Sequence, residues 1–181
     1  LHLPDLDNTH TSEGERLERS PWSFRHLALG VVAIFFYVGC EVCIGANINL
    51  YALADGGSDV TSAMLMATLY WGGLLIGRLA GSFFKSISAR TQLTFTTSAA
   101  ALLVAVSVAL DSPWVLVSVG LMHSIMWGAI FTLAVARLGK YTSVTSGVFM
   151  VGVLGGAVLP LLQGVVADAM GLWRWSWLIV I

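Results

Sequence analysis

One acidic residue, Glu41, interrupts a long apolar run and is the residue in this sequence best placed for chemistry. A charged side chain at the centre of a bilayer costs about 2.5–3.5 kcal/mol on insertion scales, so such residues usually face a bundle interior or a water-filled cavity. Tyr37 precedes Glu41 by four residues and shares its helical face. We interpret both as substrate-binding groups, with Glu41 also a proton-coupling candidate. The alternative is a structural carboxylate paired with a neighbouring helix.

A second candidate pair is His123 and Trp127, again four residues apart in an apolar segment. On an uninterrupted helix the imidazole and the indole would lie on one face at one depth. Sugars bind through an aromatic surface against their C–H face and polar groups at their hydroxyls, and this pair offers both. The competing interpretation is a packed indole and a histidine satisfied by another helix.

Two amides, Asn47 and Gln163, also lie within apolar segments. Amides at such depths commonly form hydrogen bonds between helices, at an average of about 0.6 kcal/mol. Both are candidate ligands for substrate hydroxyls, with helix–helix bonding as the alternative.

Glycines recur at four-residue spacing in two segments, at residues 73, 77 and 81 and at residues 152 and 156. Small residues at this spacing let helix backbones approach closely. Carriers that alternate access also need helices that bend and slide. The pattern therefore predicts a closely packed bundle without selecting a mechanism.

Composition places these residues in a membrane. Of the 181 residues, 57% are hydrophobic and only 10% are charged, whereas soluble domains average about 25% charged residues. Runs of about 20 apolar residues, long enough to cross a bilayer as a helix, occur repeatedly. The net charge of −1 and the lack of a basic patch argue against nucleic acid as a partner.

The chain divides into a charged tail over residues 1–23, interpreted as a cytoplasmic linker, and a transmembrane half-bundle over residues 24–181. Turn residues and charges separate the expected helices, which cover about residues 24–54, 61–84, 93–110, 114–138, 144–167 and 172–181. The last is too short to span a bilayer, so we expect a truncated sixth helix. The predicted fold class is an all-α polytopic membrane protein.

Basic residues set the predicted orientation. Seven of the nine lie in alternate loops, namely Arg16, Arg19, Arg25, Lys85, Arg90, Arg137 and Lys140. The opposite loops hold Arg174 together with several aspartates. Because cytoplasmic loops are enriched in lysine and arginine, the N-terminal tail is predicted to be cytoplasmic. Trp173, Trp175 and Trp177 then fall at the outer interface, where tryptophan is enriched.

The sequence contains no motif of an enzyme. It lacks a serine–histidine–acid set at one depth, an H-E-x-x-H motif and a P-loop, and it suggests no metal site and no cofactor. Cys40 and Cys43 have the spacing of a redox motif but lie inside an apolar run, where that spacing means little. We interpret them as small packing residues.

Four sequence blocks resemble the C-terminal half, helices 7–12, of the fucose–galactose–glucose:proton symporter family of the major facilitator superfamily. The blocks are LALGVVAIFFYVGCEVCIG (27–45), YWGGLLIGRLAGS (70–82), SIMWGAIFTLAVARLGKYTS (124–143) and GVLGGAVLPLLQGVVAD (152–168). The resemblance implies half of a twelve-helix bundle, with a six-helix N-terminal half as its missing partner.

By this resemblance the activity is proton-coupled uptake of a monosaccharide similar to fucose, glucose or galactose, by alternating access across a bacterial inner membrane. Gly77, Arg78 and Gly81 match the signature at the cytoplasmic end, where the arginine is expected to close the inner gate by pairing with a helix end. The chain departs from the family at His123, often asparagine, and at Gly128, often proline. The first departure leaves the sugar open.

The expected partners are therefore a monosaccharide, protons, the lipid bilayer and the missing half. Two alternatives stay open from the residues. One is a major facilitator carrier or exporter of another small solute, which the polar residues within the helices disfavour only for a purely apolar substrate. The other is a half-transporter fragment that does not transport.

Overall fold

The computed structural model describes residues 20–181, apart from residues 56, 82, 84 and 85. The part of the chain that it describes is helical and contains no β-strand, so the predicted all-α fold is confirmed. The predicted tail lies largely outside the described residues, since only the 3-10 turn η2 (Pro21–Ser23) precedes the first helix.

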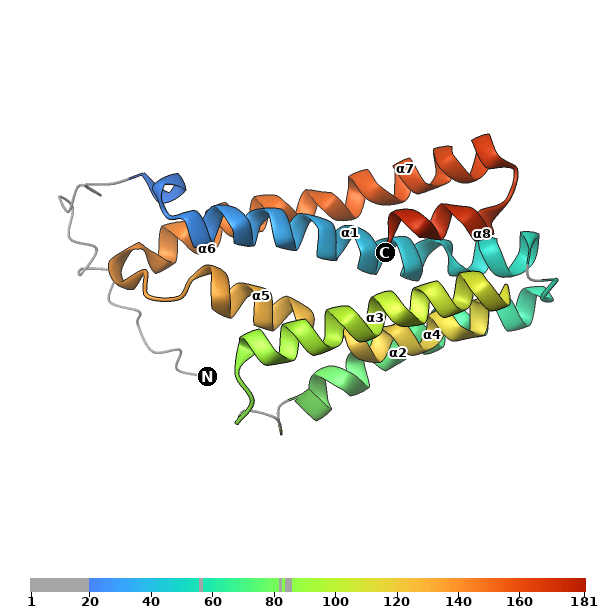
Figure 1. Cartoon of the computed structure of the whole chain (residues 1–181), viewed down its shortest axis with the longest axis horizontal. Helices are drawn as coiled ribbons and strands as arrows, with labels where there is room; N and C mark the ends of the chain where they lie inside the picture. Colours follow the sequence, from blue (N-terminus) through green and yellow to red (C-terminus); the bar gives the residue numbers. More distant parts are fainter. Residues whose placement is uncertain (1–19, 56, 82, 84–85) are drawn as a thin grey trace, which may run out of the picture.

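Among the described residues, five helical segments are long and apolar enough to cross a membrane: Arg25–Ala54, Val60–Gly81, Ala89–Leu110, Pro113–Ala134 and Thr142–Met170. The α-helices in chain order are α1 (Arg25–Ala54), α2 (Val60–Gly81), α3 (Ala89–Leu110), α4 (Pro113–His123), α5 (Met126–Ala134), α6 (Thr142–Met150), α7 (Gly155–Met170) and α8 (Trp173–Ser176). The described residues also form the 3-10 turns η3 (Gly139–Tyr141), η4 (Val151–Leu154) and η5 (Trp177–Ile179). Figure 1 shows how these elements are arranged.

Local chemistry explains several helix ends. Ser88 caps α3 by accepting a hydrogen bond from the Thr91 backbone N–H at 3.2 Å, which starts this helix at residue 89 instead of the predicted 93. Asp111 ends α3 in the left-handed conformation at φ 52°, and Pro113 occupies the first turn of α4, where its missing N–H costs nothing. At the start of α2, hydrogen bonds from Ser62 lower the pKa of the Asp59 carboxyl.

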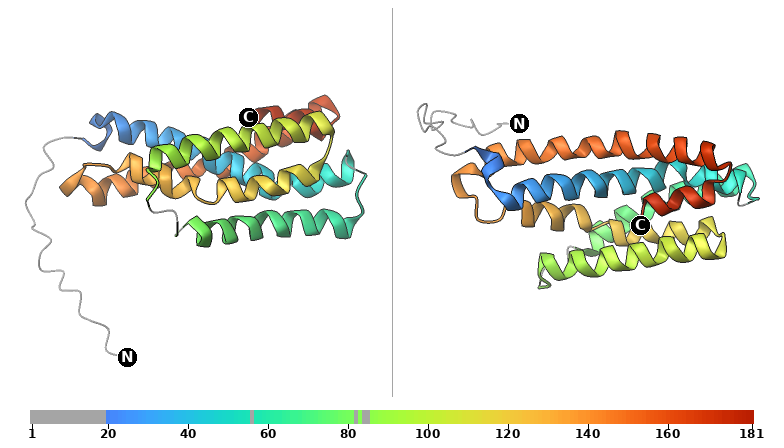
Figure 2. Two further views of the ribbon diagram at one scale, coloured as in Figure 1. Left: turned by 60° about the horizontal axis from the view of Figure 1, so that its bottom comes forward. Right: turned by 45° about the horizontal axis from the view of Figure 1, so that its top comes forward.

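Helix α1 is the central element of the bundle and contacts α2, α5, α6 and α7. It runs beside α7, as Figure 1 and the right view of Figure 2 show. Glycines allow this approach, because a Cβ at Gly155 would collide with the backbone carbonyl of Phe35. A Cβ at Gly39 would likewise collide with Leu159. The helix that carries Glu41 is thus held by backbone contact with its neighbour.

Gly73 and Gly77 of α2 pack against α4 and the residue that follows it. A Cβ at Gly77 would collide with the Ser124 side chain and lie 3.2 Å from the Leu121 carbonyl oxygen. In the other direction, a Cβ at Gly120 would lie 2.5 Å from the Tyr70 carbonyl oxygen. The small-residue spacing therefore serves close packing of these two helices.

Two spanning segments are interrupted where the sequence suggested continuous helices. The segment expected over residues 114–138 consists of α4 and α5, separated at Ser124 and Ile125. The Ser124 hydroxyl bonds the Leu121 carbonyl at 2.6 Å, and a serine bonded to its own helix in this way tends to bend it. The segment expected over residues 144–167 consists of α6, η4 and α7. The truncated sixth helix expected over residues 172–181 consists of the short α8 followed directly by η5.

Arg174 ties three elements together at one end of the bundle. Its backbone N–H bonds the Asp55 carboxylate at 2.8 Å. Its guanidinium donates to the carbonyls of Val108 at 2.7 Å and Ala109 at 3.1 Å, at the end of α3. It also lies 3.6 Å from the carboxylate of Asp111.

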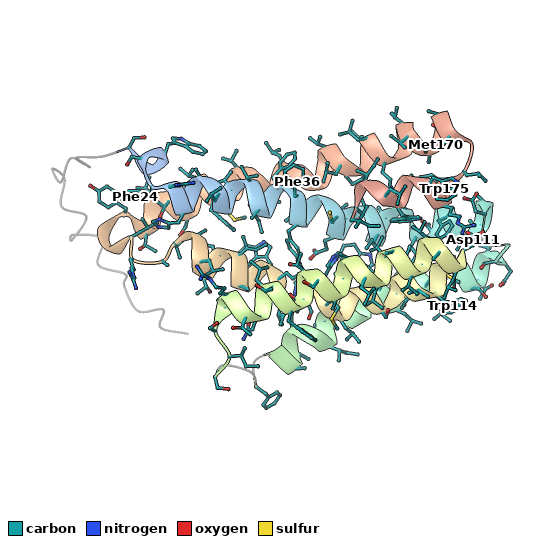
Figure 3. The ribbon with its side chains drawn as sticks, viewed as in Figure 1. Phe24, Phe36, Asp111, Trp114, Met170 and Trp175 are labelled. Carbon is teal, nitrogen blue, oxygen red and sulfur yellow. The ribbon has the colours of Figure 1, made fainter. Side chains whose placement is uncertain are left out.

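The labelled side chains of Asp111, Trp114, Met170 and Trp175 gather at this end, away from Phe24 (Figure 3). The tryptophans predicted for the outer interface behave differently from one another. Trp175 is exposed, whereas Trp177 is fully buried, with its ring 5.8 Å from that of Tyr51.

Candidate functional site

Glu41 lies near the middle of α1, and its side chain is only 11% exposed. The hydroxyl of Tyr37, one turn earlier, donates a hydrogen bond to the Glu41 carboxylate. Arg78 on α2 brings its Nη2 atom to 3.8 Å from the same carboxylate oxygen, with a side chain that is 54% exposed. The buried acid therefore has a phenol and a cation beside it, and the cation also reaches open space.

The Tyr37 hydroxyl has a second acceptor. It lies 2.8 Å from the backbone carbonyl oxygen of His123, the last residue of α4. Carbonyls in the last turn of a helix have no partner within that helix. Tyr37 thus joins the carboxylate on α1 to the end of α4.

His123 is 4% exposed, and its Nδ1 atom lies 2.9 Å from the Tyr70 hydroxyl oxygen. The same hydroxyl lies 3.0 Å from the backbone carbonyl oxygen of Glu41. Because that carbonyl only accepts, Tyr70 satisfies both contacts when it donates to Glu41 and accepts from Nδ1–H of His123. This arrangement requires a proton on Nδ1 of the imidazole.

Trp127 lies in a different environment from His123, because the helix breaks between them. Its indole stacks on Phe131, with ring centroids 5.5 Å apart and planes 15° apart, and meets the edge of Phe149. Trp127 and Arg78 line an open cleft of about 910 Å³. His123 and Tyr37 instead line a separate cavity of about 280 Å³.

The cleft lies between the ends of α2, α3 and α5. Its polar lining comes from Arg78, Ser88, Gln92, Ser124 and Thr132. Trp127 is the aromatic side chain on its wall. An indole beside amide and hydroxyl groups is a surface on which a polar solute with a C–H face can lie.

Asn47 and Gln163 form a separate polar cluster. Asn47 Nδ2 donates to Gln163 Oε1 at 2.9 Å, and Gln163 Nε2 lies 3.4 Å from the Ser176 hydroxyl. Ser176 in turn bonds the Trp173 carbonyl at 2.7 Å. Gln163 is fully buried, so these amides connect α1, α7 and α8 to one another.

The structure thus unites three predicted site residues, Tyr37, Glu41 and His123, with Arg78, and it leaves Trp127 and the amide pair in separate places. It adds Tyr70, which is not among the residues predicted above for the site. Tyr70 lies seven residues before Gly77, on the face of α2 that packs against α4. A buried tyrosine hydroxyl usually has a hydrogen-bond partner. A tyrosine on a helix face predicted to be closely packed could therefore have been identified from the sequence as a member of a polar site.

Cys40 and Cys43 are free thiols. Among the described residues, no group of three or more histidine, cysteine, aspartate or glutamate side chains is arranged to hold a metal ion.

Comparison with known proteins adds sequence relatives and solved structures. No protein-family profile matches the chain. The glucose/galactose transporter of Brucella abortus biovar 1 (strain 9-941) is 36% identical over 179 residues, which cover 95% of this chain and 43% of the transporter. The chain therefore spans less than half the length of this relative.

Two solved structures of the transporter FucP share the fold. The major facilitator superfamily transporter FucP, in the outward conformation, superposes with a TM-score of 0.82 at 24% identity, covering 88% of this chain and 41% of FucP. A substituted form of the E. coli fucose:proton symporter FucP gives a TM-score of 0.79 at 25% identity, covering 88% of this chain and 40% of that one.

Fold and relatives together define the class: a multi-pass membrane protein with the architecture of half a major facilitator transporter, and not an enzyme. The resemblance to the fucose–galactose–glucose symporter family is therefore confirmed.

Proposed function

We propose that this chain is the C-terminal half of a proton-coupled monosaccharide carrier that works by alternating access with a six-helix N-terminal half. The observation that carries the proposal is its similarity, over almost its whole length, to a protein named glucose/galactose transporter. The structural likeness to a fucose:proton symporter supports the same class of solute and the same coupling ion.

Glu41 is the proposed coupling group in this half. It is buried in the membrane-spanning part of α1 and has both a hydrogen-bond donor, Tyr37, and a cation, Arg78, within reach. An ionisable residue inside a transmembrane segment usually serves an ion or substrate path. Proton binding at Glu41 would remove its charge and break the ion pair with Arg78. Protonation would thereby change the contact between α1 and α2.

For the sugar we propose the cleft beside Arg78. Trp127 supplies the aromatic surface there, and Gln92 and Thr132 supply groups for hydroxyls. Arg78 lines this cleft and also approaches Glu41. Its position can therefore respond both to a solute in the cleft and to the protonation of Glu41. Its proposed gating role acts through Glu41, with Gly77 and Gly81 keeping α2 close to the α4–α5 segment.

His123 and the amide pair receive other roles. His123 is occupied by Tyr70 and faces a cavity apart from the cleft, so we propose that it positions Tyr37 and Tyr70. Asn47 and Gln163 bond each other, and we propose that they fix α1 against α7.

The proposed setting is a bacterial inner membrane, with the N-terminal tail and the cleft on the cytoplasmic side. Support comes from the basic residues, since Arg25, Arg78 and Arg90 fall at the ends of α1, α2 and α3 that share this side. Cytoplasmic loops are enriched in arginine and lysine. The opposite end holds Asp55, Asp59 and Asp111 with Arg174.

The test is uptake of labelled fucose, glucose, galactose and N-acetylglucosamine by the complete two-half protein in vesicles, with and without an imposed proton gradient. Accumulation of one sugar that collapses with a protonophore is the expected result. Equal uptake in both conditions would contradict proton coupling. No uptake of any sugar by correctly inserted protein would contradict the substrate class and favour a carrier of another solute or a half that does not transport.

A further inference from the structure

The Tyr37 hydroxyl has one proton and two acceptors. It is in hydrogen-bond contact with the Glu41 carboxylate and lies 2.8 Å from the His123 carbonyl oxygen. A phenol donates a single hydrogen bond. The two acceptors therefore compete for this proton whenever Glu41 is ionised, because an ionised carboxylate only accepts.

Protonation of Glu41 removes the competition. A protonated carboxyl group has its own O–H and can donate to the Tyr37 oxygen. Tyr37 is then free to donate to the His123 carbonyl. The hydrogen bond from Tyr37 to the end of α4 therefore forms when Glu41 is protonated. When Glu41 is ionised, its carboxylate competes with the His123 carbonyl for the same hydroxyl proton.

The carbonyl in question lies at a weak point of the bundle. His123 ends α4, and Ser124 and Ile125 separate it from α5. Helix α5 carries Trp127 and Thr132 to the wall of the cleft. A change in hydrogen bonding at the end of α4 is therefore placed to change the direction of α5 and the width of the cleft.

We propose that Tyr37 is a positioning residue that transmits the protonation of Glu41 to the break between α4 and α5. With Glu41 protonated, Tyr37 caps α4 and holds α5 in one orientation. With Glu41 ionised, Tyr37 turns to the carboxylate and α5 is released. The inference rests on the proposed function, since it gives the coupling proton a structural consequence.

The other groups around Glu41 do not supply this link. On α1 the nearby titratable side chains are the thiols Cys40 and Cys43. From α2, Arg78 pairs with the carboxylate, whereas the Tyr70 hydroxyl bonds the Glu41 backbone carbonyl and not its carboxylate.

Among the described residues of the remaining helices packed on α1, only α4 brings a titratable group to this site, the imidazole of His123, which bonds Tyr70. Helix α5 has no ionisable side chain, and in α7 the only one is Asp168, next to its outer end.

Tyr70 provides a matched control for Tyr37. Both are buried tyrosines that bond a backbone carbonyl and lie beside His123. Replacing either by phenylalanine removes one hydroxyl and almost no volume. Only the Tyr37 hydroxyl contacts the Glu41 carboxylate.

The experiment measures the distance between spin labels at Ala80 on α2 and Thr132 on α5, both exposed. It uses the complete protein in nanodiscs, with Cys40 and Cys43 replaced by alanine and no sugar added. Distance distributions are recorded in mildly acidic and mildly alkaline buffer for the parent protein and for its Tyr37→Phe, Tyr70→Phe and Glu41→Gln variants.

The parent protein is expected to shift between two distance populations with pH. Tyr37→Phe is expected to lose the shift, and Tyr70→Phe to keep it. Glu41→Gln is expected to show the acidic population at every pH, because a glutamine amide can donate to Tyr37 as a protonated carboxyl does.

Three results would overturn the inference: no shift in the parent, a shift of parental size in Tyr37→Phe, or a shift that persists in Glu41→Gln. The last applies even if Tyr37→Phe proves too unstable to measure. Because no sugar is present, these results are independent of the uptake assay. Failure of the proposed function would appear in the uptake assay. In that case the spin-label distance in the parent protein would shift with pH, but the protein would transport no sugar.

Discussion

The Arg78 guanidinium lies 3.8 Å from the carboxylate of Glu41, on the neighbouring helix, and it is the only cation that pairs with this acid among the described residues. The acid is buried and the base is half-exposed. An ion pair of this kind joins α1 to α2 only while Glu41 is charged. Its strength is therefore open to control by a proton.

Replacing Arg78 by methionine removes the charge and retains an apolar stem. We expect Arg78→Met to lower the free energy of unfolding by about 1–3 kcal/mol, less than the 3–5 kcal/mol seen when a fully buried pair is broken, because Arg78 is half-exposed. The double variant Glu41→Gln/Arg78→Met should recover part of the loss. Thermal unfolding in detergent measures all three proteins. Strictly additive losses would show that the two side chains do not interact.

Gly77 and Gly72 lie on the same helix and differ in their surroundings. A Cβ at Gly77 would meet Ser124 and the Leu121 carbonyl, whereas nothing lies within 4 Å of one at Gly72. Gly77→Ala should destabilise the bundle by about 1–3 kcal/mol through overpacking. Gly72→Ala should be neutral or stabilising by up to about 1 kcal/mol, the helix propensity gain. Equal effects of the two substitutions in an unfolding assay would refute the close contact of α2 with α4.

The sequence predicts contacts between residues close together along one helix better than contacts between different helices. Glu41 and Tyr37 are one turn apart, so helical periodicity alone placed them together. The pairing of His123 with Trp127 assumed a continuous helix, and the break at Ser124 separated them. Nothing local marks that break strongly, because serine is common in transmembrane helices.

Contacts between different helices were still harder to predict from the sequence. The choice of Tyr70 as the partner of His123 depends on how α2 packs against α4. The sequence indicated close packing through Gly77 but not the register of the two helices. Register comes from the combined fit of side chains across the interface, which one sequence does not specify.

Substitution of Gln163 tests whether the hydrogen-bonded amides Asn47 and Gln163 stabilise the bundle or bind the substrate. Gln163→Ala leaves Asn47 without its buried acceptor, which should cost about 1–3 kcal/mol of stability. The apparent affinity of the complete transporter for its sugar should stay unchanged. Asn49→Ala is the control, because within the described part of the chain the Asn49 side chain accepts a hydrogen bond only from the adjacent Leu50 N–H. A large rise in KM for Gln163→Ala, with normal stability, would instead make Gln163 a sugar ligand.

Arg174 and its hydrogen-bond partners lie at the end of the bundle opposite the cleft, and we expect them to contribute to stability. Arg174→Ala removes two hydrogen bonds to the end of α3 and the ion pair with Asp111. Hydrogen bonds of charged groups contribute about 1.5–3 kcal/mol, and partial exposure places the expected loss near the lower figure. Arg174→Lys should recover little, because an ammonium group lacks the planar fork that reaches two carbonyls. Unfolding measurements with full recovery in Arg174→Lys would show that charge alone matters.

The most direct measurement of proton coupling compares the complete transporter with its Glu41→Gln variant in vesicles loaded with unlabelled sugar and in empty vesicles under a proton gradient. Glutamine keeps the shape and the hydrogen bond to Tyr37 but cannot release a proton. We expect Glu41→Gln to exchange labelled for unlabelled sugar at a rate close to that of the parent, yet to fail to accumulate sugar in response to the gradient. Accumulation at the parental level, with equal amounts of protein in the membrane, would contradict a coupling role for Glu41.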